Sequence, residues 1–213
     1  MSGKKNRSDL NISGFSPMVL NLLSPQSTKN SPAKNQAVIE AINTGANKLI
    51  AGYQRWKVNE QKGLNSLNII HSLREKSKTS SEPQSFTELE VCCEQLKAIE
   101  TILLSIVNEV AVIKSQIETS ISIQRTMSIS SEDPILQQLI SIEKFLNMLK
   151  QLYESGLSIK KEVIENIAHT GSSLESHEFI ASWHCQSIAN EISRLIMQLK
   201  TSPADCRWEI YSF

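Results

Sequence analysis

Six prolines determine where this chain can form helices, at positions 17, 25, 32, 83, 134 and 203. A proline inside a helix costs about 3 kcal/mol, because it lacks an amide hydrogen and its ring clashes with the preceding turn. The prolines leave three long uninterrupted segments, residues 33–82, 84–133 and 135–202. Each segment is long enough for many helical turns, so the sequence predicts an all-α protein.

The second of these segments has the most regular apolar pattern. Its apolar residues recur alternately every three and four positions, a period of 3.5 that keeps one stripe of a helix facing a neighbouring helix along a supercoil. The stripe comprises Leu89, Cys92, Leu96, Ile99, Leu103, Ile106, Val110, Ile113 and Ile117. We therefore expect a long amphipathic helix here.

The other two segments repeat the pattern, each with one charged residue inside its apolar stripe. Glu60 interrupts the first stripe, and Lys160 interrupts the third. Three glycines in the first segment lower its intrinsic helix stability, so packing must hold that helix. The two stripes comprise Ile39, Ile42, Ala46, Leu49, Tyr53, Trp56, Gly63, Leu67 and Ile70, and Ile135, Leu139, Ile142, Leu146, Leu149, Tyr153, Gly156, Val163 and Ile167.

A turn and a new helix are expected after the third stripe. The third helix should end at His169-Thr170-Gly171, where glycine can adopt the left-handed conformation that caps helices. Ser172 and Glu175 then fit a capping box that begins a fourth helix.

The expected architecture is an elongated antiparallel helical bundle or coiled coil of about four long helices. The bundle occupies 34–200, with helices at about 35–75, 86–125, 134–169 and 173–199, between a disordered Ser/Pro-rich tail at 1–33 and an aromatic tail at 201–213. The first three helices would be about 50–65 Å long, more than a compact chain of this size needs. We therefore expect part of the stripe to face other proteins, with the candidates Tyr53, Trp56, Leu96, Leu103, Val110 and Ile117.

Composition narrows the classes of partner. The chain has 22 basic and 22 acidic residues and a formal net charge of zero, whereas nucleic acids and anionic membranes attract a strongly basic surface. No apolar run approaches the about 18 residues of a membrane span. The four cysteines match no disulfide framework and no signal peptide precedes them. These features predict a protein of a reducing compartment that binds other proteins, and neither nucleic acid nor membrane directly.

The sequence contains no motif for catalysis or cofactor binding. Its seven glycines are scattered singly, so there is no phosphate loop and no nucleophile elbow. The residue types His169, His177, His184 and Cys185 suit zinc, but their spacing fits no common site. Cys185 also makes a poor nucleophile, since the adjacent His184 points to another helix face. We expect no enzyme, cofactor or metal.

Three Ser-Pro pairs crowd the N-terminal tail, with the serines Ser16, Ser24 and Ser31. Ser31 is followed by Pro32, Ala33 and Lys34, the pattern that cyclin-dependent kinases favour. Phosphorylation would add about −1.5 to −2 charges at each site and could recruit or release a basic partner. The alternative is that these pairs are ordinary loop chemistry in a serine-rich tail.

Two stretches carry a resemblance to a known family. Residues 167–171 read Ile-Ala-His-Thr-Gly, and residues 179–184 read Phe-Ile-Ala-Ser-Trp-His. They resemble the cyclin-dependent kinase 2-interacting protein family, which has an Ala-His-Thr-Gly turn and then an aromatic–aliphatic–small stretch ending in tryptophan, at the spacing of Gly171 and Trp183. The helix at 46–59 is also similar, and the likeness spans about residues 40–190. The motif residues are Ala168, His169, Thr170, Gly171, Phe179, Ile180 and Trp183.

The resemblance implies a nuclear and cytoplasmic adaptor without catalysis. It implies links to DNA replication through cyclin-dependent and replication kinases, and to replication-origin and checkpoint proteins of the DNA damage response and the cell cycle. It also implies a place in an AAA-type ATPase assembly that matures the large ribosomal subunit, where the chain would pair with a second small helical subunit.

Two alternatives stay open at this point. Phe179, Ile180 and Trp183 could be an interface hot spot. Alternatively, Trp183 could pack under the His169–Gly171 turn as part of the core, which is the more usual place for a tryptophan beside a tight turn. The apolar stripes also suit a structural coiled-coil subunit of a tethering, spindle or kinetochore complex.

Overall fold

The computed structural model describes residues 32–77, 84–127 and 133–201, and within them every element is helical. The helices are α1 (Pro32–Ser77), α2 (Gln84–Met127), α3 (Pro134–Asn166), a 3-10 turn η1 (Ile167–His169), α4 (Ser173–His184) and α5 (Gln186–Thr201). The predicted all-α class is confirmed. Residues 1–31 of the predicted disordered tail, with the three candidate phosphorylation sites, and residues 202–213 of the aromatic tail lie outside the described residues. The predicted tail boundaries are corrected, because residues 32–33 belong to α1 and Thr201 belongs to α5.

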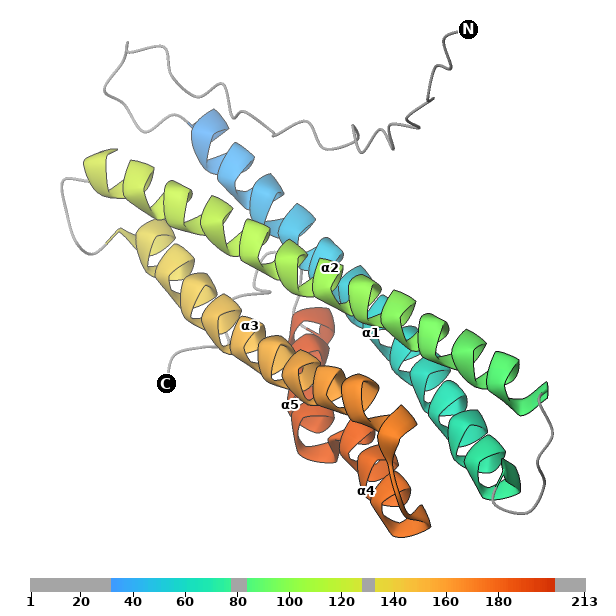
Figure 1. Ribbon diagram of the computed structural model, residues 1–213. Helices are drawn as coiled ribbons and strands as arrows, with labels where there is room; N and C mark the ends of the chain where they lie inside the picture. The colour runs from blue at the N-terminus through green and yellow to red at the C-terminus, as the bar shows by residue number, and fades with distance from the viewer. Residues whose placement is uncertain (1–31, 78–83, 128–132, 202–213) are drawn as a thin grey trace, which may run out of the picture. The chain divides into compact units, whose positions relative to one another are not determined.

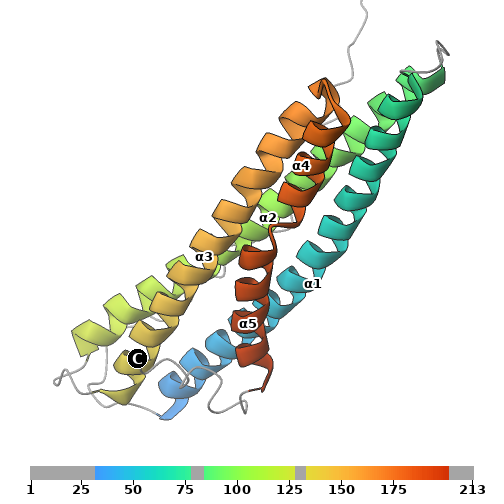
Figure 2. The same cartoon turned by 90° about the horizontal axis from the view of Figure 1, so that it is seen from below.

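The first three helices run antiparallel to their neighbours, and α2 lies beside both α1 and α3 (Figure 1). Helices α4 and α5 then return along α1 and α3 on the side away from α2 (Figure 2). The result is a bundle with four positions, in which α4 and α5 together fill the fourth. Within the described ranges, no helix is long and apolar enough to cross a membrane.

A proline lies at or just before the start of each of the three long helices, at positions 32, 83 and 134. Pro134 occupies the first turn of α3, and the preceding Asp133 accepts a hydrogen bond from the Ile135 amide at 2.9 Å. The same carboxylate accepts a second bond from the side-chain amide of Gln124 at 2.6 Å, which ties the end of α2 to the start of α3. A proline at this position loses nothing, because the first amides of a helix have no partner inside the helix.

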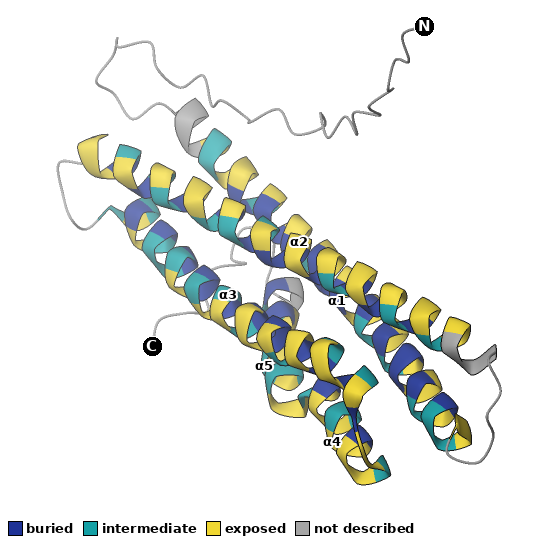
Figure 3. Cartoon of the chain, viewed as in Figure 1, coloured by how far each residue is buried: buried dark blue, intermediate teal, exposed yellow. Residues whose placement is uncertain are grey.

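The apolar stripes of the three long helices form one continuous core (Figure 3). Buried and exposed residues alternate with the helical period along each helix, so the heptad pattern predicted the buried faces. Ile39 is the exception in the first stripe, because it is 40% exposed near the beginning of α1. Burial along α1 begins at Ile42.

The expected single fourth helix is wrong, since Cys185 divides it into α4 and α5. Cys185 has φ 30° and ψ 62°, the left-handed conformation. It is the only non-glycine residue with positive φ in the described ranges. The left-handed cap expected at Gly171 is absent, because no described glycine has positive φ. The chain therefore bends at a cysteine, a residue type that offers no sequence signal for a bend.

Candidate functional site

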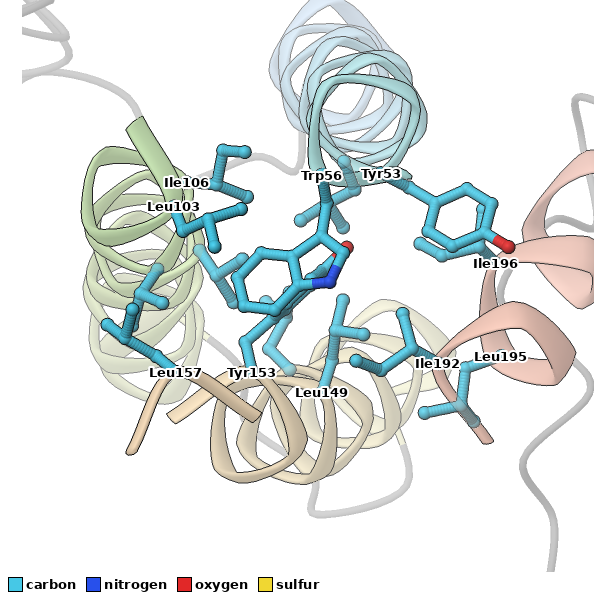
Figure 4. Close-up of a cluster of buried hydrophobic side chains, with 14 of the residues drawn as sticks. Tyr53, Trp56, Leu103, Ile106, Leu149, Tyr153, Leu157, Ile192, Leu195 and Ile196 are labelled. Carbon is cyan, nitrogen blue, oxygen red and sulfur yellow. The ribbon is translucent and has the colours of Figure 1, made fainter. Parts of the chain in front are cut away.

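The stripe residues that we expected to face partner proteins lie inside this chain's own core. Trp56, Leu96, Leu103, Val110 and Ile117 are all buried, and so is Tyr53. The reason is the fourth position of the bundle, where α4 and α5 cover the groove between α1 and α3 (Figure 2). Figure 4 shows Ile192, Leu195 and Ile196 of α5 packed beside Leu149 of α3 and Tyr53 of α1. This prediction is corrected, and any docking surface must be sought on the outer faces.

The family-motif turn, residues 167–171, is held in place by Arg74 of α1. The guanidinium of Arg74, near the end of α1, donates hydrogen bonds to the backbone carbonyls of Ala168 and Thr170. Thr170 is buried, and its hydroxyl donates to the Ile167 carbonyl at 3.1 Å. His169 is exposed. Arg74 thus satisfies carbonyls that the end of α3 leaves without helical partners.

The capping residues that follow the turn act as predicted, with one variation. The Ser172 hydroxyl accepts from the Glu175 amide at 3.1 Å, and the Glu175 carboxylate reaches back to the Gly171 amide at 2.7 Å. In a standard capping box the carboxylate would bond the amide of the capping serine itself. Here the bond falls one residue earlier and fixes Gly171.

The four candidate zinc ligands are not brought together. His169, His177 and His184 are exposed at separate points of α4 and its preceding turn. His177 instead faces His71 of α1, with 4.3 Å between ring centroids, and the His71 Nδ1 atom lies 3.0 Å from the Ser176 hydroxyl. Among the described residues, no group of three or more histidines, cysteines or carboxylates could hold a metal ion.

Trp183 is part of the core and not of an exposed hot spot. It packs against α1, however, and not under the His169–Gly171 turn. Its indole nitrogen donates to the Glu60 carbonyl at 2.9 Å, and its ring fills the space beside Gly63. A Cβ atom on Gly63 would lie 2.8 Å from both Cε2 and Cη2 of that ring, closer than real Cβ atoms approach other atoms. Trp183 is near the end of α4, about 15 Å along the helix from Ser173 and its turn. Phe179 and Ile180 are half-buried beside the core.

Lys160 and Glu60, the two charged residues that interrupt the stripes, meet beside Trp183. The ammonium of Lys160 lies 2.7 Å from Glu60 Oε1 and donates to the Trp183 carbonyl at 2.6 Å. It also lies 5.1 Å from the centroid of the Trp183 ring and 5.8 Å from that of Trp56, so indole faces cover the charge. The Lys160 side chain is only 2% exposed. An amine so enclosed and paired holds three helices together and is out of reach of a substrate.

Tyr153 completes this cluster from α3. Its ring centroid lies 4.7 Å from that of Trp56 at a tilt of 59°, a favourable aromatic pairing. The hydroxyl is buried and has no hydrogen-bond partner in the described part of the chain. Burial, and secondarily the nearby Tyr53 and Glu60, raise the pKa of Tyr153 well above its ordinary value. The phenol therefore stays neutral and contributes packing.

An open cleft lies on the surface next to this cluster, between α1 and the junction of α4 and α5. It encloses about 200 Å³. Its lining combines aromatic, aliphatic and polar side chains: Tyr53, Trp56, Lys57, Glu60, His184, Gln186, Ala189, Asn190, Ile192 and Ser193. Figure 4 shows the Tyr53 side chain extending from α1 toward α5, where it lies beside Ile196. We call this site the α1–α5 cleft.

The outer face of α2 is unusual because it lacks charge. Every exposed residue between Lys97 and Arg125 is uncharged: Ala98, Thr101, Ile102, Leu104, Ser105, Asn108, Val112, Ser115, Gln116, Thr119 and Ser122. At 1.5 Å per residue this uncharged face is about 36 Å long. We call it the α2 outer face.

The charged residues of the same stretch are drawn to the sides of α2. Glu109 pairs with Arg55 of α1, and Glu100 lies 3.4 Å from Lys161 of α3. Lys114 and Glu118 pair with one another along α2. The four that belong to α2, Glu100, Glu109, Lys114 and Glu118, are half-buried rather than exposed. The ion pairs therefore leave the α2 outer face neutral.

The cysteines of α2 show no sign of reactivity. Burial raises the pKa of Cys92, with smaller contributions from Cys93 and Glu88, and burial also raises the pKa of Cys93 against the opposing effect of Lys97. Since the thiolate is the reactive form, both thiols are weak nucleophiles at neutral pH. Cys92 packs in the core as the small apolar residue that its stripe position predicted.

Comparison of the chain with protein-family models, with curated proteins and with solved structures finds no match.

Proposed function

We propose that this protein is a non-enzymatic adaptor that works by binding other proteins, and that its principal docking surface is the α2 outer face. The observation that supports the proposal is that none of the exposed residues between Lys97 and Arg125, along about 36 Å of α2, is charged. Buried parts of protein interfaces are depleted in charged residues, because a charge that loses water without gaining a partner is costly. The exposed faces of helices in a monomer have no such reason to exclude charge.

The mixture of side chains on this face fits a helix of another protein. Ile102 and Val112 supply exposed apolar area, at 39% and 55% exposure. Thr101, Ser105 and Ser115 lie on the same exposed face and are small enough to let a second helix approach closely. An amphipathic helix laid along such a face would bury its own apolar stripe, which is a common mode of protein recognition.

The family resemblance supplies the proposed identity of the partners. It points to an AAA-type ATPase assembly, with a second small helical subunit, in large-ribosomal-subunit maturation, and to replication kinases and checkpoint proteins. A nuclear and cytoplasmic location follows from the same resemblance. The alternative, a structural subunit of a tethering, spindle or kinetochore complex, would use the same face for a different helix.

The test is affinity purification of tagged full-length protein, comparing the wild type with the Ile102→Lys, Val112→Lys double variant. We expect the wild type to recover AAA-type ATPase subunits in stoichiometric amounts and the variant to lose them. The matched control is Val58→Lys with Ile69→Lys, which changes the same residue types on α1 at 54% and 47% exposure. Loss with both variants, or with neither, contradicts the α2 outer face as the docking surface. Recovery of cytoskeletal or membrane machinery instead would favour the alternative.

A further inference from the structure

The α1–α5 cleft has the size of a receptor for one anchor side chain. Its volume of about 200 Å³ is below the range of about 300–1,000 Å³ that holds a drug-sized ligand or cofactor. Trp56, Ile192 and Ala189 give it an apolar lining, and polar groups such as Asn190 stand among them. An aromatic side chain inserted from a peptide segment fits this volume and chemistry.

The charges around the cleft favour an acidic residue beside that anchor. Lys57 is exposed, and its ammonium lies 5.8 Å from the Tyr53 ring centroid. No carboxylate in the described ranges forms an ion pair with Lys57. The one carboxylate of the lining, Glu60, is already paired with Lys160. The positive charge of Lys57 therefore has no counter-charge within the described lining, so the cleft attracts a negative charge.

We propose that the cleft binds this chain's own Trp208-Glu209 segment, with the indole as the anchor and the Glu209 carboxylate beside Lys57. Outside the described residues, Trp208 is the only aromatic residue with an acidic neighbour. This inference is independent of the proposed function, because it concerns the opposite side of the bundle from the α2 outer face.

The chain length permits this docking. From Thr201, the end of α5, back to Asn190 in the cleft is about 17 Å, at 1.5 Å for each helical residue. Residues 202–207 can span about 20 Å when extended, at about 3.3 Å per residue. Trp208 can therefore reach the cleft without any change in α5.

Tryptophan fluorescence of the full-length chain tests the proposal directly. The chain has three tryptophans, and Trp56 and Trp183 are 3% and 0% exposed. Emission that acrylamide quenches readily must therefore come from Trp208. In the wild type we expect all three tryptophans to be shielded. Glu209→Lys should make one of the three freely quenchable, and so should Lys57→Glu.

Charge exchange and a matched control complete the experiment. The Lys57→Glu, Glu209→Lys double variant should restore shielding, since the ion pair is reversed and not removed. Lys62→Glu changes an exposed lysine of the same helix that does not line the cleft, and it should leave quenching unchanged. Filling the cleft with Ala189→Phe should release Trp208. A wild-type chain in which one tryptophan is quenched as freely as in Glu209→Lys would overturn the proposal, and the cleft would then serve a segment of another protein.

Discussion

Glu60 and Lys160, the charged residues that interrupt two separate apolar stripes, are each other's partner, with 2.7 Å between Oε1 and Nζ. Each residue would be a defect in its own helix. Together they form a pair at the point where α1, α3 and α4 meet, and the Trp183 carbonyl takes another of the lysine's hydrogen bonds.

Removing one member of this pair should be far worse than removing both. Lys160→Met leaves the Glu60 carboxylate almost buried without a counter-charge, and we expect a loss of about 3–5 kcal/mol in the free energy of unfolding. The Glu60→Leu, Lys160→Met double variant should recover most of that loss, because two apolar side chains replace two desolvated charges. Urea unfolding followed by circular dichroism measures both. A double variant as unstable as the sum of its single changes would contradict the pairing.

Alanine substitutions at two glycines of α1 should have opposite signs. Gly63→Ala places a methyl group inside the Trp183 ring's space, so we expect a loss of more than about 2 kcal/mol from overpacking. Gly52→Ala meets nothing closer than an Ile106 methyl group at 3.5 Å. It should therefore gain about 0.5–1 kcal/mol, because alanine is the better helix former. Thermal unfolding of the two variants side by side tests this, and equal effects would show that the ring can move aside.

Tyr153→Phe should stabilise the protein. The substitution keeps the ring that packs on Trp56 and removes a buried hydroxyl without a hydrogen-bond partner. Desolvation of such a hydroxyl costs about 1–3 kcal/mol, and we expect the variant to recover part of it. A lower free energy of unfolding for Tyr153→Phe would mean that the hydroxyl bonds to water or to a residue outside the described ranges.

The same tyrosine should make the protein less stable in alkali. Its ordinary pKa is 10.0 and the folded value is raised, so above pH 10 the unfolded chain loses a proton that the folded chain keeps. Unfolding then releases a proton, and stability falls with rising pH by up to about 1.4 kcal/mol per pH unit from this group. Tyr153→Phe should show a shallower decline than the wild type in denaturant titrations above pH 10. Parallel curves would assign the decline to other residues.

The bend at Cys185 should respond to the conformational preference of its residue. A left-handed backbone costs about 1–2 kcal/mol for most residues and nothing for glycine. Cys185→Gly should therefore be neutral or slightly stabilising, whereas Cys185→Val should lose at least about 1 kcal/mol because its branched side chain fits this conformation poorly. The midpoints of thermal unfolding rank the two variants. A more stable valine variant would indicate that α4 and α5 can join into one helix.

The sequence predicts the helices well because periodicity and proline placement are local signals. Predicted ends at about 75 and 125 compare with Ser77 and Met127 in the structure. The interpretation of the stripes as partner-facing is wrong. An apolar stripe has the same sequence pattern whether the helix that packs on it belongs to the same chain or to another. Helix length suggested surplus apolar surface, but the return of α4 and α5 along α1 and α3 covers it.

The central cluster was present in the sequence only as isolated exceptions. Glu60 and Lys160 stood out as opposite charges in two stripes, and their pairing could have been proposed from that alone. Gly63 gave a weaker signal, since a glycine in a stripe indicates close approach without saying what approaches. The bond of Arg74 to the family-motif turn, and the ion pairs that clear the α2 outer face of charge, depend on which helices are neighbours, and periodicity carries no such information.

The clustering of Glu60, Lys160 and Trp183 also has a consequence for how the protein is made. In a nascent chain that contains α1, α2 and α3 but not yet α4, the Trp183 ring is missing from its place beside Gly63. Lys160 also lacks the Trp183 carbonyl that accepts its hydrogen bond. The core is covered only after α4 and α5 have both been synthesised, since both contribute buried residues to it. Until then the chain exposes apolar surface of the kind that makes folding intermediates prone to aggregate and to need chaperones.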